Sequence, residues 1–96
     1  MKYIIIDKTT KARLCCDFLW RTFANFGTYN SCVKFYKSKA AAIKRAKRLN
    51  CQPMVLGLPE DLHLDAGGNC WFEEEISPGW INNIPAKLED FVIWEK

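Results

Sequence analysis

The sequence predicts a small α+β domain in which one amphipathic helix packs on one face of an antiparallel sheet of about five or six short strands. Hydrophobic residues make up 49% of the chain, and 96 residues are enough to build one core but not two. Short apolar runs alternate with turn residues, whereas only one stretch combines a helix cap with a helical period. We therefore expect residues 1–96 to form a single domain.

The first strand is expected at residues 2–7, "KYIIID", because this β-branched run is too short for a helix. The polar "DKTTK" after it predicts a turn. Residues 13–26 fit two structures. Apolar residues alternate as on a strand, at Leu14, Cys16, Phe18 and Trp20. Charged residues recur at every fourth position as on a helix, at Arg13, Asp17 and Arg21. We favour a strand, because a hairpin would cover the edge of the first strand.

The principal helix is expected at residues 38–50, "SKAAAIKRAKRLN". Ser38 is a good N-cap, and Asn50 followed by Pro53 predicts the end of the helix. At 100° per residue one face is apolar and consists of Ala42, Ile43, Ala46 and Leu49. The helix should therefore pack against the sheet with this face and expose its basic residues on the other.

The C-terminal half predicts further strands around one long connection. "PMVLGLP" at residues 53–59 is expected to be a strand, and residues 60–75 read as two extended pieces joined by a glycine turn at residues 66–69. Residues 77–90, "SPGWINNIPAKLED", are expected to be a connection with one helical turn near residues 86–90. The closing "FVIWEK" predicts a strand that could lie beside the first strand.

Charge is distributed unevenly along the chain. Residues 1–50 hold twelve Lys or Arg against two acidic residues, a net charge of +10, and residues 51–96 hold two against nine, a net charge of −7, which together give the chain's +3. Five of the basic residues form a cluster on and beside the helix that has the composition of a phosphate-contacting surface. This basic cluster consists of Lys37, Lys44, Arg45, Lys47 and Arg48. It is a candidate binding surface, unless the acidic half of the chain neutralises it.

Two features of the acidic half are candidate contacts for a partner. The run Glu73, Glu74 and Glu75 could imitate nucleic-acid phosphates or fill a basic groove, or it could be a solvated strand end. Trp80 follows "SPG" in an expected loop and is a candidate anchor, or it folds back onto the core.

The sequence contains no signature of catalysis or of a metal centre. The five cysteines lack the paired spacing of zinc ligands and are expected to be small core residues, and no cofactor motif is present. His63 between Asp61 and Asp65, with Cys70 beyond, permits a nucleophilic Cys/His pair, although a surface histidine explains the pattern more simply. Because no catalytic signature is present, we expect a protein that is not an enzyme. No segment has the length and apolarity of a membrane span or signal peptide, so we expect a cytoplasmic protein.

The order of segments resembles that of small accessory proteins of bacteriophages and mobile elements. The residues that carry this resemblance are "KYIIIDKTTKARL", an aromatic loop, "FYKSKAAAIKRAKRLN", a strand and the closing "FVIWEK". Members with known roles include anti-CRISPR and other anti-defence inhibitors, which commonly use a charged patch to occlude a host complex. The resemblance implies a non-enzymatic inhibitor of a host protein or ribonucleoprotein complex. The alternative is a small nucleic-acid-binding protein that uses the helix at residues 38–50.

Overall fold

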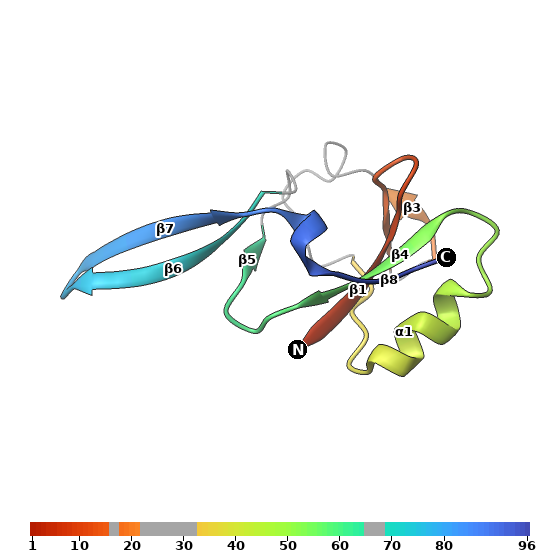
Figure 1. Cartoon of the computed structure of the whole chain (residues 1–96), viewed down its shortest axis with the longest axis horizontal. Helices are drawn as coiled ribbons and strands as arrows, with labels where there is room; N and C mark the ends of the chain where they lie inside the picture. The colour runs from red at the N-terminus through yellow and green to blue at the C-terminus, as the bar shows by residue number, and fades with distance from the viewer. Residues whose placement is uncertain (16–17, 22–32, 65–68) are drawn as a thin grey trace.

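The computed structural model describes residues 1–15, 18–21, 33–64 and 69–96 of the chain. The described residues form two antiparallel sheets, one α-helix and one short 3-10 helix, so the expected α+β class is confirmed (Figure 1). They contain eight strands rather than the five or six expected, and these strands are divided between a larger and a smaller sheet. The molecule is elongated, with extents of 48 × 27 × 20 Å.

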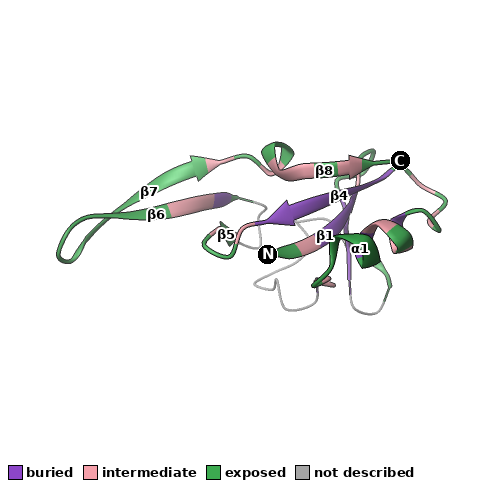
Figure 2. Ribbon diagram, turned by 60° about the horizontal axis from the view of Figure 1, so that its bottom comes forward, coloured by how far each residue is buried: buried purple, intermediate pink, exposed green. Residues whose placement is uncertain are grey.

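The larger sheet has five strands in the order β3-β2-β1-β4-β8 and forms the body of the molecule. Its strands are β1 (Lys2–Asp7), β2 (Arg13–Leu14), β3 (Trp20–Arg21), β4 (Pro53–Leu58) and β8 (Val92–Glu95). The strands β1 and β4 pair over their full length at the centre, and β4 is buried throughout (Figure 2). The expected strands at residues 2–7 and 53–59 are therefore confirmed.

Both faces of this sheet are covered, which explains why β1 and β4 are continuous apolar runs. Ile5 and Val55 point to the face that packs against the helix, together with Ala42 and Ala46. The opposite face carries a second apolar cluster: Ile4, Ile6, Cys15, Val33, Met54, Leu56 and Leu58. Because side chains alternate along a strand, burial on both sides requires apolar residues at successive positions.

The helix α1 spans Lys39–Ala46 and covers one face of the larger sheet. The Ser38 hydroxyl accepts a hydrogen bond from the amide of Ala41 at 3.3 Å, which confirms the predicted N-cap. The helix ends earlier than the predicted Asn50. The amides of Arg48 and Leu49 each bond to the carbonyl three residues before, at 3.1 Å, so the last turn tightens after Ala46.

The stretch from residue 13 forms two short strands rather than one. β2 pairs with β1 in the expected hairpin, but Phe18 has a φ of 62° and the chain turns back, so that β3 pairs with β2. The Phe18 amide bonds to the Cys15 carbonyl at 2.8 Å and closes this turn. The expected single strand with Leu14, Cys16, Phe18 and Trp20 on one face is therefore wrong, and residues 16–17 and 22–26 lie outside the described residues.

The smaller sheet has three strands in the order β5-β6-β7, which span His63–Leu64, Cys70–Ser77 and Trp80–Ala86. The expectation of an irregular connection is wrong for residues 80–86, which form β7. These residues lack a clear alternation because both faces of the strand are exposed. The expected helical turn near residues 86–90 corresponds to the 3-10 helix η2 (Leu88–Phe91). The predicted glycine turn at residues 66–69 falls mostly outside the described residues.

The last strand, β8, pairs with β4 and not with β1, so its expected neighbour is wrong. β1 already has β2 on one edge and β4 on the other, and it has no free edge for a third partner. The C-terminal strand therefore extends the sheet on the outer side of β4.

Candidate functional site

The strands β6 and β7 form a long hairpin that projects from the body (Figures 1 and 2). Their pairing runs from Cys70 opposite Ala86 to Ser77 opposite Trp80. At about 3.4 Å per residue, the eight residues of β6 span about 27 Å. We call this hairpin, residues 70–86, the arm.

A proline-glycine turn closes the arm at its tip. Gly79 has a φ of +82°, and a Cβ added there would meet no atom within 4 Å. A positive φ at the residue after Pro78 is what a type II turn requires, and glycine adopts it without a steric penalty. The turn is therefore set by local sequence and not by packing against the body.

Only the root of the arm packs against other parts of the protein. Trp71 and Phe72 are half-buried, and the Phe72 ring meets the edge of the Phe91 ring at a centroid distance of 6.2 Å. Every residue from Glu73 to Pro85 is exposed. The outer part of the arm is thus held by its own backbone pairing alone, and isolated two-stranded hairpins are only marginally stable in water.

The tip of the arm exposes three large apolar side chains. The exposed fractions are 68% for Ile76, 71% for Trp80 and 61% for Ile81. The sequence left open whether Trp80 is exposed or folds back onto the core, and the structure shows that it is exposed. Ile76 and Ile81 were not among the candidates predicted from the sequence. Neighbouring exposed apolar residues on a protein surface commonly mark an interaction site.

The three glutamates lie between this tip and the root. The cross-strand register pairs Glu74 with Asn82 on one face, and Glu73 with Asn83 and Glu75 with Ile81 on the other. All three glutamates are exposed. Both faces of the arm therefore present negative charge behind an apolar tip.

His63 of β5 lies beside the root of the arm, where it pairs with Trp71. Its ring stacks on Trp71 with a centroid distance of 5.7 Å, and its Nε2 atom lies 3.6 Å from Oε2 of Glu73. Among the described carboxylates, Glu73 is the one that pairs with His63. The expected arrangement of Asp61 and Asp65 on one face with His63 stays a prediction, because Asp65 lies outside the described residues.

The structure does not bring His63 and Cys70 together. His63 pairs with Trp71, and Leu64 pairs with Cys70, so the two side chains point to opposite faces of the smaller sheet. Cys70 is buried, and its thiol donates a hydrogen bond to the Ala86 carbonyl at 3.2 Å.

The cysteines within the described ranges are free thiols. Cys15 and Cys70 are buried, as expected for small core residues, and Cys51 is half-buried. Burial raises the pKa of the Cys51 thiol, and the nearby Asp7 carboxylate raises it further. Within the described ranges no three His, Cys, Asp or Glu side chains gather as metal ligands would. Cys16 and Cys32 lie outside these ranges.

Four of the five residues in the basic cluster are exposed, namely Lys37, Lys44, Lys47 and Arg48. Arg45 is the exception, since it is half-buried and its guanidinium stacks over the Phe18 ring at 4.6 Å. Its assignment to the exposed basic face is therefore wrong. Arg45 follows Ala42 by three positions and so lies at the margin of the buried stripe.

Within the described residues, no acidic side chain forms an ion pair with this surface. The ion pairs among the described residues join the N-terminus to Glu60 at 2.5 Å, Lys8 to Glu95 at 3.8 Å and His63 to Glu73. None of them involves an exposed residue of the basic cluster. The helix and the arm lie apart in both views of the molecule (Figures 1 and 2).

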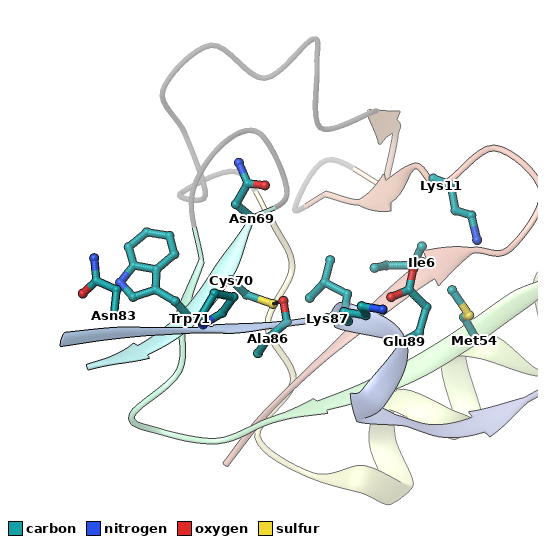
Figure 3. Close-up of a pocket in the computed structure, with 12 residues that line it drawn as sticks. Ile6, Lys11, Met54, Asn69, Cys70, Trp71, Asn83, Ala86, Lys87 and Glu89 are labelled. Carbon is teal, nitrogen blue, oxygen red and sulfur yellow. Dashed lines mark hydrogen bonds between the residues drawn. The ribbon is translucent and has the colours of Figure 1, made fainter. Parts of the chain in front are cut away.

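A hollow of about 610 Å³ lies where the arm joins the body. Ile6, Lys11 and Met54 line it from the body, Trp71 and Asn83 line it from the arm, and Asn69 lines it just before β6 (Figure 3). Lys87 and Glu89 lie between these two groups. This hollow could not be predicted from the sequence, because its residues come from segments that only the fold brings together.

No helix in the described part of the chain has the length and apolarity to cross a membrane. Comparison of the chain with protein-family models, with curated proteins and with solved structures finds no match.

Proposed function

We propose that this protein is a non-catalytic inhibitor of the phage anti-defence type, which acts in the host cytoplasm by inserting its arm into a cationic surface of a host macromolecular complex. The observation that carries the proposal is the arm itself, in which an exposed tryptophan and two exposed isoleucines lie next to three exposed glutamates. Host complexes that grip nucleic acid, such as CRISPR ribonucleoproteins, offer grooves lined with Lys and Arg that suit this combination.

The two parts of the arm would contribute differently to binding. The glutamates follow one another along β6 and could occupy positions that phosphates take in such a groove. Their charge would raise the association rate, and this effect would decrease with salt. Trp80, with Ile76 and Ile81 beside it, would provide the apolar contact that slows dissociation. Among the described residues, Glu73 lies 3.6 Å from Nε2 of His63, whereas Glu74 and Glu75 form no ion pair, so these two carboxylates are available to a partner.

Two variants test this proposal. Tagged protein is used to capture complexes from bacterial hosts, and the captured complex is purified and titrated while its binding of labelled nucleic acid is measured. We expect nucleic-acid binding to be lost near one equivalent. Trp80→Ala should weaken the interaction about 30-fold or more, as truncation of a central aromatic anchor does. Replacing Glu73, Glu74 and Glu75 with Gln should lower the association rate and its salt dependence.

A control variant, Asp61→Asn with Asp90→Asn, removes two exposed carboxylates that are not part of the arm and should bind like the wild type. Equal binding by the wild type and by both arm variants would contradict the proposal. Nucleic-acid binding that persists at saturating protein would contradict the inhibitory part of it.

The second candidate function is direct nucleic-acid binding through the exposed residues of the basic cluster. The observation that favours it is that these four side chains make no ion pair within the described structure. Four phosphate contacts would give a slope of about −3.6 in log K against log salt for duplex DNA.

Fluorescence anisotropy of labelled DNA tests this candidate across a salt series. Charge reversal at Lys44, Lys47 and Arg48 should abolish binding, whereas reversal at the exposed Lys87, close to the root of the arm, should leave most of it. Absence of binding at low salt would rule out this candidate.

A further inference from the structure

The outer edge of β7 is an unprotected strand edge. β7 has seven residues and lies at one end of the order β5-β6-β7, so no neighbouring strand of the described chain pairs with its outward N–H and C=O groups. No charged residue occurs between Ile76 and Ala86. Long, exposed, uncharged edges commonly pair with another strand, and proteins usually guard them.

The other strand edges of the described chain are guarded. β3 and β5 have only two residues each, and the pairing of β8 with β4 contains an irregularity. The free edge of β6 beyond β5 carries the three glutamates. β7 differs from these edges because it is long and carries no charge, so its outer edge is available to pair with another strand.

The side chains of β7 favour a second copy of the same strand as the occupant. In an antiparallel pair of strands, directly opposed residues point to the same face of the sheet. When a two-fold axis relates the two strands, one residue must therefore lie directly opposite its own copy, and the axis passes between these two copies. With the axis at Asn82, Trp80 lies opposite Ile84 of the second copy and Ile84 opposite Trp80. Aromatic and β-branched residues form favourable cross-strand pairs. The two Asn82 amides, which each offer a donor and an acceptor, would lie side by side.

The position of Pro85 selects this register over the next one. With the axis at Asn82, Pro85 lies opposite Gly79 in the turn and outside the new ladder. With the axis at Asn83, Pro85 would lie opposite Ile81 inside the ladder, where proline has no N–H to donate. Asn82 would also face Ile84 on both sides.

We infer that β7 pairs antiparallel with β7 of a second copy about a two-fold axis at Asn82, which forms a continuous sheet β6-β7-β7-β6. This inference goes beyond the proposed function and does not depend on it. The glutamates of both copies lie on the outer strands, so like charges are separated by two uncharged strands. The faces of the joined arms remain open, and the dimer would present two sets of glutamates and two Trp80 side chains.

The first test is the mass of the purified full-length protein over a range of concentrations, measured by sedimentation equilibrium. An edge pairing of this length buries less than a standard interface of about 1,600 Å², so we expect a reversible monomer-dimer equilibrium. Asn82→Lys places two like charges at the axis and should yield a monomer, whereas Gln52→Lys in the body adds the same charge and should leave the dimer intact. A wild type that stays monomeric at every concentration would overturn the inference.

The second test identifies the register by disulfide trapping. Directly opposed residues have Cα atoms about 4.5–5.5 Å apart, which suits a disulfide, so Asn82→Cys should crosslink two copies under mild oxidation. Asn83→Cys lies diagonal to itself across the axis and should not crosslink above the wild-type level, which serves as the background from the native cysteines. Circular dichroism would verify that both variants fold. Crosslinking of Asn83→Cys alone, or of neither variant, would overturn the assigned pairing.

Discussion

Truncating a core isoleucine should destabilise the protein strongly, whereas truncating an apolar side chain at the tip of the arm should have little effect, because the first is buried and the second is exposed. Ile5 of β1 is fully buried on the face of the sheet that α1 covers, whereas Ile81 is 61% exposed at the tip. Ile5→Ala removes apolar contact and leaves a cavity in the helix-covered face, which costs about 2–5 kcal/mol. Ile81→Ala and Trp80→Ala remove exposed atoms and should each change the free energy of unfolding by less than about 0.5 kcal/mol.

Urea unfolding followed by circular dichroism measures these free energies at protein concentrations low enough that copies do not associate. For a domain whose free energy of unfolding is about 5–15 kcal/mol, Ile5→Ala should strongly lower the urea concentration at the unfolding midpoint. The dependence of the free energy of unfolding on urea concentration should change little. A loss above about 1 kcal/mol for Trp80→Ala would refute the reasoning. It would mean that Trp80 packs against the protein's own body and is not available to a partner.

Three further predictions concern single positions. Ser38→Ala removes the N-cap bond to Ala41 and should destabilise the protein by about 1 kcal/mol, measured by thermal unfolding, whereas Ser38→Asp should restore the cap. Gly79→Ala forces a side chain into a φ of +82° and should shift the amide resonances of the arm while those of β1 and β4 stay unchanged. Because burial and Asp7 raise the pKa of Cys51 above its ordinary 9.0, the folded state holds this proton more tightly. Stability should therefore fall as pH rises through 9.0, and Cys51→Ser should remove that part of the decline.

Local features of the fold could be predicted from the sequence. Ser38 and the alanine-rich stretch after it specify a helix within a few residues, and the β-branched run of β1 specifies a buried strand without reference to the rest of the chain. Features that depend on distant partners could not be predicted. The neighbour of β8 depends on which strand of the sheet has a free edge. The partial burial of Arg45 depends on its contact with the Phe18 ring, which lies far away in the sequence.

The candidate site shows the same division. The exposed residues of the basic cluster follow from helical spacing, and the three glutamates are obvious as a run. The arm that carries those glutamates was not predicted, because "WINNIPA" has exposed residues on both faces and so lacks the alternation by which a half-buried strand is recognised. Ile76 and Ile81 become candidates only when the hairpin brings them to the tip with Trp80.

The fold converts an uneven distribution of charge in the sequence into two surfaces that remain separate in space. Exposed charges farther apart than about 8–10 Å are largely screened at physiological salt, and the glutamates lie on an arm that points away from the helix (Figure 1). The glutamates of the arm and the exposed residues of the basic cluster therefore do not cancel each other locally, although the net charge is only +3. Salt should consequently act on the two surfaces independently, and charge reversal in the basic cluster should leave the salt dependence of binding through the arm unchanged.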